Sequence, residues 1–358
     1  MAKPSLQESP LAKTLAEYTR EGACELYAKH PNHEVVCFAC GHRCVIRDGR
    51  IGICKVRFNE GGVLKVPAGY VGALQCDPIE KKPFFHVLPG SLALSFGMLG
   101  CDYHCAYCQN WITSQALRDP EAVSSVLPMT PEQLVKMAHD YGAPVIASTY
   151  NEPLITSEWA VDVFRVAKAK GLRTAYISNG NGTPEVLAYI KPWVDYYKVD
   201  LKGFSQEEYR KLGGQLVGVL DTIKRLHEMG FWVEIVTLII PGFNDTEQEL
   251  KALTEFLVSV SPDLPWHVTA FHKDYKMIEP DNTTAGALIR AAEIGRKSGL
   301  RYVYAGNLPG QVGPYEDTRC HGCGTTIVKR IGYRIVEKTI KPDGACPNCT
   351  TKIPGIWS

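Results

Sequence analysis

Short apolar and β-branched runs alternate with longer segments of helical periodicity through the middle of the chain. Consecutive side chains of a strand lie on opposite faces, whereas a helix brings an apolar side chain back to one face every three to four residues. The strand-like runs cover residues 92–96, 145–149, 174–178, 197–201, 232–240, 267–271 and 302–305. The helical segments between them cover residues 131–141, 157–170, 184–189, 216–229, 246–260 and 285–298. The pattern predicts an α/β protein in which strands and helices alternate.

Six strand–helix units followed by a last strand are typical of a parallel barrel that stops short of eight strands. We therefore predict a partial (β/α)6 barrel over about residues 88–308. Residues 1–87 would form an N-terminal helix and a cysteine-rich module, and residues 309–358 a second cysteine-containing module. Right-handed crossovers would place every strand–helix loop at the same end of the barrel. Glycines in position to end four of the helices are Gly142, Gly171, Gly230 and Gly299.

The loops that follow the strands carry most of the polar and glycine-bearing motifs. The first contains three cysteines, and the later ones cover residues 150–153, 179–182, 200–202, 241–245, 272–274 and 306–310. Seven separate segments would meet at one end of the barrel, where barrel enzymes carry their active sites. Each loop also has a structural explanation, because Asn244, Asp245 or Thr246 would cap the next helix and Asp200 would pair with a neighbouring lysine.

The three cysteines of the first loop, Cys101, Cys105 and Cys108, stand at CxxxCxxC spacing. A [4Fe–4S] cluster normally takes four thiolates, so three of them leave one iron free to bind a molecule that is not protein. The alternative is a zinc site that includes His104, because thiolates suit zinc as well as iron–sulfur clusters. We favour the cluster.

This spacing, with Tyr107 just before the last cysteine, resembles the signature of the radical S-adenosylmethionine (SAM) superfamily. The resemblance implies that the open iron chelates the amino and carboxylate groups of SAM. An electron from the reduced cluster would then break a carbon–sulfur bond and release methionine and a 5′-deoxyadenosyl radical, which abstracts hydrogen from a substrate. A flavodoxin- or ferredoxin-type protein would supply the electron.

The loops resemble the branch of this superfamily that includes the pyruvate formate-lyase activating enzyme. Its Gly-Gly-Glu-Pro segment, which binds the cofactor's amino group, appears here as Tyr-Asn-Glu-Pro, so the resemblance makes Thr149, Asn151 and Glu152 candidate ligands. Its Thr-Asn-Gly and Asp-Leu-Lys segments appear as residues 178–180 and 200–202. The further ligands implied are Asn179, Asp200, Lys202 and, at the ribose or adenine end, His272. Lys202 is a suitable partner for a carboxylate.

The flanking motifs are similar to those of the AmmeMemoRadiSam-system radical SAM enzymes. The matching features are Cys37-x2-Cys40-x3-Cys44-x9-Cys54, the run Asp-Pro-Ile-Glu-Lys-Lys-Pro at 77–83, the Cys-Gln-Asn-Trp at 108–111 and the C-terminal cysteine pairs. That family is named for genes of the Memo and AMME types found together with it. The resemblance therefore implies Memo-like and AMME-like partners and does not identify a substrate.

Two further cysteine groups lie outside the barrel segment. Near the C-terminus, Cys320, Cys323, Cys346 and Cys349 form two Cys-x2-Cys knuckles, the layout of a four-cysteine zinc ribbon with a structural or docking role. Near the N-terminus, Cys37, Cys40, Cys44 and Cys54 would bind either a second zinc or an auxiliary [4Fe–4S] cluster. We lean to zinc for this group.

Composition and charge narrow the function classes. Thirteen cysteines, eleven of them in three local groups, indicate metal ligation in a reducing compartment rather than a disulfide framework. A net charge of +1 makes no general case for nucleic acid or acidic lipid, although the C-terminal module is locally basic. No run reaches the ~18 apolar residues of a membrane span, and the first ten residues lack the profile of a secretion signal. We expect a cytoplasmic enzyme.

Three functional hypotheses remain open. The first is radical SAM chemistry on a protein or peptide, as in glycyl-radical activation, and the second is the same chemistry on a small molecule. The modules outside the barrel segment argue against assuming the first. The third hypothesis is a non-catalytic zinc-binding scaffold that docks nucleic acid or protein, and it predicts no bound iron and no dependence on SAM.

Overall fold

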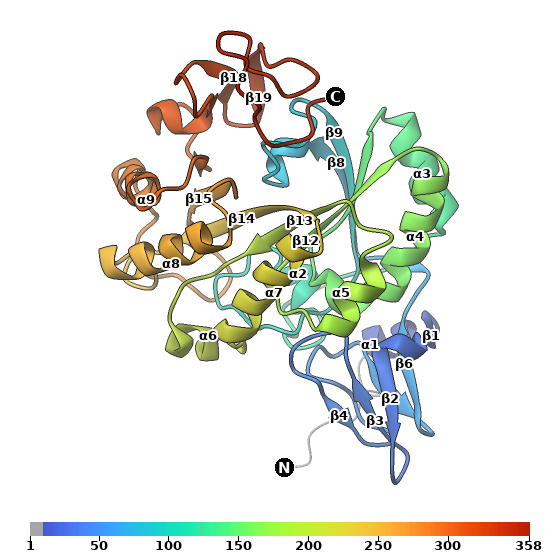
Figure 1. Cartoon of the computed structure of the whole chain (residues 1–358). Helices are drawn as coiled ribbons and strands as arrows, with labels where there is room; N and C mark the ends of the chain where they lie inside the picture. The colour runs from blue at the N-terminus through green and yellow to red at the C-terminus, as the bar shows by residue number, and fades with distance from the viewer. Residues whose placement is uncertain (1–9, 123) are drawn as a thin grey trace.

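The computed structural model describes residues 10–122 and 124–358 and is built around one eight-stranded sheet (Figure 1). Its strands follow the order β16-β15-β14-β13-β12-β11-β9-β8, and β8 and β16 are its two edges. The parallel strands are β9 (Leu92–Gly97), β11 (Val145–Ser148), β12 (Arg173–Ser178), β13 (Tyr196–Asp200), β14 (Trp232–Ile239), β15 (Trp266–Ala270) and β16 (Val303–Gly306). The edge strand β8 (Ala73–Pro78) is antiparallel to β9.

Helices connect the parallel strands and cover the outer face of the sheet (Figure 1). They are α3 (Pro131–Asp140), α4 (Ser157–Ala169), α5 (Pro184–Ile190), α7 (Leu216–Glu228), α8 (Glu247–Val260) and α9 (Ala285–Ser298). All seven strands and six helices predicted from the apolar pattern are confirmed, with ends that differ by at most one residue. Apolar residues of both layers pack into one large core, because each helix turns an apolar stripe toward the sheet.

Local sequence explains where several of these helices begin and end. The side chains of Thr130, Thr183, Thr246 and Thr284 accept a hydrogen bond from a backbone N–H in the first turn of α3, α5, α8 and α9. These bonds satisfy donors that a helix start otherwise leaves without partners. Thr246 is thus the cap among the three candidates in its loop. Gly142, Gly171, Gly230 and Gly299 all have the positive φ expected after a helix.

Short elements that the periodicity does not reveal complete the loops. They are α2 (Trp111–Ser114), α6 (Gln206–Leu212), the 3-10 turns η3 (Ile79–Lys81) and η4 (Pro153–Thr156), and the two-stranded pair β7 (Tyr70–Val71) with β10 (Leu127–Pro128). Strand β8 lies in the segment that the sequence assigned to the N-terminal module, yet it pairs with β9 over its full length. The central sheet therefore extends to the N-terminal side of residue 88.

The N-terminal region contains two small antiparallel sheets beside the central one (Figure 1). One has the order β1 (Thr19–Glu21), β6 (Val63–Pro67), β5 (Phe58–Glu60), and the other β2 (Tyr27–His30), β3 (Glu34–Cys37), β4 (Val45–Ile46). Helix α1 (Pro10–Ala16) and the turn η2 (Cys24–Leu26) accompany them. Residues 1–9, on which the absence of a secretion signal partly rests, lie outside the described residues.

The C-terminal region forms a third antiparallel sheet, with β17 (Thr318–Arg319), β18 (Thr326–Ile331) and β19 (Arg334–Lys338), preceded by the turn η5 (Gly313–Glu316). It contacts the central sheet near both edges. Leu88, after β8 and η3, donates its N–H to the Ile356 carbonyl. At the other edge, the hydroxyl of Tyr304 on β16 lies 3.0 Å from the hydroxyl of Thr318 on β17. Among the described residues, no helix is long and apolar enough to cross a membrane.

Candidate functional site

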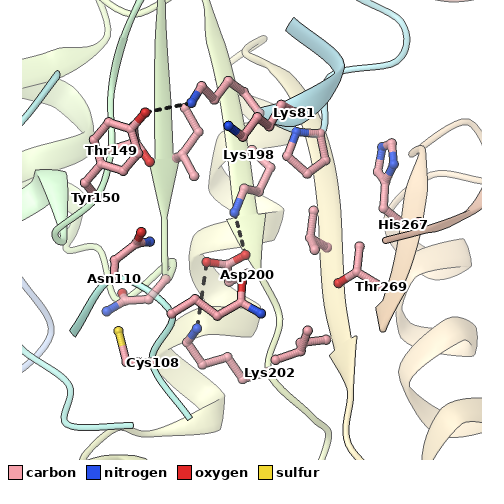
Figure 2. Close-up of a pocket in the computed structure, with 18 of the residues that line it drawn as sticks. Lys81, Cys108, Asn110, Thr149, Tyr150, Lys198, Asp200, Lys202, His267 and Thr269 are labelled. Atoms are coloured by element: carbon pink, nitrogen blue, oxygen red, sulfur yellow. Dashed lines mark hydrogen bonds and ion pairs between the residues drawn. The ribbon is translucent and has the colours of Figure 1, made fainter. Parts of the chain in front are cut away.

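A cavity of about 380 Å³ lies on the inner face of the central sheet (Figure 2). Side chains of β12 to β16 form its walls, and the loops after β9, β11 and β12 reach it as well. Six of the seven SAM contacts and all three cysteines predicted from the sequence line this one cavity. They are Thr149, Asn151, Glu152, Asn179, Asp200 and Lys202, with Cys101, Cys105 and Cys108.

The cysteine loop begins where β9 passes closely under the backbone of the next strand's loop. A Cβ atom at Gly97 would clash with the carbonyl oxygen of Thr149, so this position requires glycine. Gly100 follows with φ of 91°, a conformation that other residues rarely adopt. The chain can therefore turn sharply and bring the three cysteines into the cavity.

The environment of the three thiols fits a metal cluster. Burial raises the pKa of Cys101 and Cys108, and it raises the pKa of Cys105 to about 11. A buried thiolate is costly unless a positive centre lies beside it, and a bound cluster supplies one. The Tyr103 N–H donates to Cys101 Sγ at 3.4 Å, and Cys108 Sγ lies 3.1 Å from the Ser114 hydroxyl. Polar contacts of this kind stabilise sulfur ligands.

Asp102 joins the cysteine loop to the loop after β12, and the sequence did not point to it. Its carboxylate is fully buried and accepts hydrogen bonds of 2.7 Å from the side-chain amides of Asn179 and Asn181. A histidine of the N-terminal region, His42, lies 4.0 Å away. Nothing in the motif marks this residue, because its partners are distant in the chain. Asp102 fixes Asn179 and so leaves that amide less free to bind a ligand.

Glu152 lies at the centre of the site and is fully buried. It accepts hydrogen bonds from the backbone N–H groups of Leu154 and Asn179 and from the Ser178 hydroxyl, at 2.7 to 3.0 Å. Burial and the nearby Asp102 nevertheless hold the pKa of Glu152 above its usual range. A cationic group bound beside Glu152 would relieve this electrostatic cost.

Asn151 and Thr149 border the same cavity and are held by different hydrogen bonds. The Asn151 side chain accepts from the Met98 N–H and donates to the Glu152 carbonyl, so it holds two loops together. The Thr149 N–H donates to the Phe96 carbonyl at the end of β9. Between them, Tyr150 adopts φ of 66°, which turns its side chain toward the cavity wall.

On β13, one carboxylate is shared by two lysines. Figure 2 shows Asp200 between Lys198 and Lys202, at distances of 2.5 and 3.7 Å. Both lysines and Asp200 belong to the cavity wall. Burial lowers the pKa of Lys198. For Lys202, the attraction of Asp200 outweighs burial and raises the pKa.

His272 does not join the other predicted ligands. Its side chain is about half exposed, outside the residues that line the cavity, and its Nε2 atom lies 3.0 Å from the side-chain amide of Gln109. Gln109 follows Cys108 and does line the cavity, so His272 stands at the rim. Its assignment to the cofactor stays a prediction.

The two flanking cysteine groups differ in compactness. Sulfur atoms of Cys320, Cys323, Cys346 and Cys349 lie within 4.8 Å of one another, an arrangement that could hold a metal ion. In the N-terminal group, Cys37, Cys40 and Cys54 are buried and Cys44 is partly exposed. This group lies against the cysteine loop of the cavity, since a Cβ at Gly100 would contact the Cys54 carbonyl. The metal at either group stays a prediction.

Comparisons with known proteins agree with the geometry of the cavity. The family model described as Radical SAM superfamily matches residues 97–257, which include the cysteine loop and the strands up to β14. The uncharacterized protein MJ0808 of Methanocaldococcus jannaschii is 36% identical over 326 residues, covering 90% of this chain and 95% of that protein. This chain belongs to the same family as MJ0808, and residues 97–257 form a radical SAM domain.

More distant relatives match part of the chain. The pyruvate formate-lyase-activating enzyme of Staphylococcus epidermidis is 27% identical over 192 residues, which span 49% of this chain and 74% of that enzyme. The match to a crystal structure of Streptococcus suis SuiB covers 66% of this chain and 54% of the SuiB chain, with 13% sequence identity and a TM-score of 0.49. A radical SAM domain implies a [4Fe–4S] cluster and SAM. The narrower assignment to the AmmeMemoRadiSam system stays a prediction.

Proposed function

We propose that the cavity holds a [4Fe–4S] cluster on Cys101, Cys105 and Cys108 and binds SAM beside it. When bound, the cluster and SAM supply a reductively formed 5′-deoxyadenosyl radical that abstracts hydrogen from a substrate. The observation that carries the proposal is the meeting of these cysteines with Glu152, Asp200 and Lys202 in one cavity. The cofactor performs the difficult chemistry, and the protein provides position and electrostatics.

The residues around the cluster suit the charges of SAM. Glu152 is a buried carboxylate of the cavity and is linked to the cysteine loop through Asn179 and Asp102, so it would accept the ammonium group. Lys202, which shares Asp200 with Lys198, would pair with the carboxylate. Asn179, held by Asp102, would orient the cofactor through its remaining polar atoms.

The surroundings of the cavity favour a small substrate over a protein loop. Tyr333, between β18 and β19, lines the cavity and donates a hydrogen bond to the Asn307 side chain after β16. From the other edge, Arg330 donates to the Phe85 carbonyl. The C-terminal sheet thus contacts both edges of an open sheet, where a peptide would otherwise enter. We infer that the hydrogen donor is a small molecule.

The C-terminal metal, the protein partners and the cellular location are also proposals. Zinc at the four C-terminal cysteines would hold together a module with little core of its own. Its role would be structural, because a zinc ion bound by four thiolates has no open position for catalysis. A flavodoxin- or ferredoxin-type donor and Memo-like and AMME-like partners follow from the sequence resemblance. A cytoplasmic location is proposed because the grouped cysteines suit metal ligation in a reducing compartment.

The decisive experiment is anaerobic reconstitution with iron and sulfide, followed by addition of dithionite and SAM. We expect 5′-deoxyadenosine from the wild-type protein and none from Cys105→Ala. Cys24→Ala, which removes an exposed cysteine outside the three groups, is the matched control and should behave like wild type. Absence of iron and of 5′-deoxyadenosine, with zinc near three per chain, would instead favour the scaffold hypothesis.

A further inference from the structure

Two adjacent lysines stand at the end of the cavity farthest from the cysteines. Lys82 is almost fully buried, and its ammonium donates to Asp77 at 3.0 Å and to the Tyr150 hydroxyl at 2.9 Å. Lys81 donates to the other oxygen of Asp77 at 2.9 Å. Both lysines line the cavity. Two cations therefore share one carboxylate, and each ammonium has at least one N–H beyond its bonds to Asp77 and Tyr150.

At the middle of the cavity, two lysines again share one carboxylate. Lys198 and Lys202 share Asp200, so four lysines in the wall have two carboxylates to pair with. The other acids of the wall are engaged elsewhere. Glu80 accepts from the Gly90 N–H and lies 3.7 Å from Arg330, and Glu152 accepts three hydrogen bonds. The ammonium groups of these four lysines therefore outnumber the two carboxylates that pair with them directly.

The proposed cofactor does not neutralise this excess. SAM brings one carboxylate together with one ammonium and one sulfonium, so its binding adds positive charge overall. Its carboxylate would be met near Lys202, beside the cysteine loop. Positive charge that is withdrawn from water is costly without an anionic partner. The lysines at the far end need a partner other than the cofactor.

Figure 2 shows the order of these groups along the cavity. Cys108 lies at one end, Asp200 and Lys202 near it, Lys198 beyond them, and Lys81 at the opposite end. A molecule held by the far lysines would extend back toward the cofactor between the apolar side chains of Val236 and Leu238 on β14 and Ile177 on β12. Such walls suit the carbon skeleton of a substrate whose C–H bond must meet the cofactor.

We propose that Lys81, Lys82 and Lys198 bind the anionic group, a carboxylate or a phosphate, of the small-molecule substrate. This inference rests on the proposed radical SAM function, because it assigns the substrate class of the same cavity. Tyr150, which already bonds Lys82, would help to orient the anion. The bound anion would pair with the positive charge of these lysines that Asp77 and Asp200 do not neutralise.

Calorimetric titration of the reconstituted, SAM-loaded protein tests the proposal without turnover. Inorganic phosphate and acetate are the two probes, each added at constant ionic strength with chloride as the background anion. We expect at least one to bind, and the relative affinities distinguish a phosphate from a carboxylate ligand. Binding should weaken about tenfold or more in Lys82→Gln and in Lys81→Gln.

Lys136→Gln is the matched control, because Lys136 pairs with Asp140 on the exposed face of α3, far from the cavity wall. It should bind both anions like wild type. If Lys82→Gln fails to fold, the more exposed Lys81 carries the test. Absence of binding by wild type, or equal binding by wild type and both lysine variants, overturns the proposal. Because 5′-deoxyadenosine is measured separately, a failure here is distinguishable from failure of the proposed function.

Discussion

Glu152 illustrates how a single residue acquires its role from its surroundings. Its carboxylate is buried, receives three hydrogen bonds and lies in the cavity with the cysteines. Two of the donors are Ser178, the last residue of β12, and Asn179, which follows it, so the side chain also ties its own loop to the end of β12. A carboxylate in this position is preorganised to bind a cation, because the three donors already hold its orientation.

At this scale we predict that Glu152→Gln weakens SAM binding by about tenfold or more, since a hydrogen bond to a charged group contributes roughly 1.5–3 kcal/mol. The amide keeps the shape of the side chain but removes the negative charge. Equilibrium binding of SAM to the reconstituted protein measures the effect, and the iron content should not change. Glu207→Gln, at an exposed position on α6, is the control. Unchanged SAM affinity in Glu152→Gln would remove this residue from the cofactor site.

Between elements, a buried ion pair joins the N-terminal region to the central fold. Arg57, just before β5, forms two hydrogen bonds of 2.7 Å with Glu158 on α4, and both side chains are almost fully buried. Arg57 also donates to the Ile155 carbonyl in η4. The attraction of Glu158 raises the pKa of Arg57 despite burial, so the guanidinium stays charged. A buried pair of this kind sets the position of one element against another.

Removal of one partner of this pair should be strongly destabilising. We predict that Arg57→Ala lowers the free energy of unfolding by about 3–5 kcal/mol, because Glu158 is left as an unpaired buried charge. Denaturant unfolding monitored by circular dichroism measures the change. Lys136→Ala, which breaks an exposed pair on α3, should cost about 0.5 kcal/mol or less. A loss below 1 kcal/mol in Arg57→Ala would show that this buried pair contributes little to stability.

For the whole molecule, the contact between the C-terminal sheet and the central sheet depends on a buried aromatic and polar cluster. His86 lies within it, with Nδ1 2.6 Å from the Pro354 carbonyl and Nε2 2.6 Å from the Tyr304 hydroxyl. The carboxylate of Glu234 on β14 accepts a hydrogen bond from the backbone N–H of His86 and lies 2.7 Å from Nε2 of His267 on β15. The described C-terminal residues are therefore anchored by groups that also reach the wall of the cavity.

His86 makes the stability of this contact depend on pH. Burial lowers the pKa of His86 from 6.5 to about 4, although Glu234 opposes the shift and Arg330 and His267 add to it. Between pH 6.5 and 4 the unfolded chain takes up a proton that the folded chain does not. The stabilisation is therefore complete above pH 6.5 and is lost as the pH falls to 4, by about 1.4 kcal/mol per pH unit.

We predict that His86→Asn makes the free energy of unfolding fall less steeply with decreasing pH in this window. Tryptophan fluorescence follows the transition, since Trp232 and Trp357 both lie against His86. The exposed His139 on α3 gives the control variant His139→Asn, whose pH dependence should match that of wild type. Identical slopes for wild type and His86→Asn would contradict the assignment.

How well the sequence predicted each feature depends on how far apart in the chain the interacting residues lie. The strands and helices of the central fold were predictable because apolar periodicity and caps such as Thr246 act within a few residues. The convergence of Cys105, Glu152 and Lys202 followed from the alternation alone, since the loops after parallel strands lie at the same end. Strand β8 escaped prediction because its pairing with β9 depends on a partner rather than on a period.

By itself, the sequence determined the alternating α/β order, the cysteine spacing and the loops that carry the site, because each depends on neighbouring residues. Only the tertiary structure decided that Asp102 holds Asn179, that His272 stays at the rim and that Lys82 faces the cavity. The partners of these side chains lie tens of residues away in the chain, and their contacts exist only once the sheet has brought distant loops together. Burial, which sets the pairing of their charges, is likewise a property of the folded molecule.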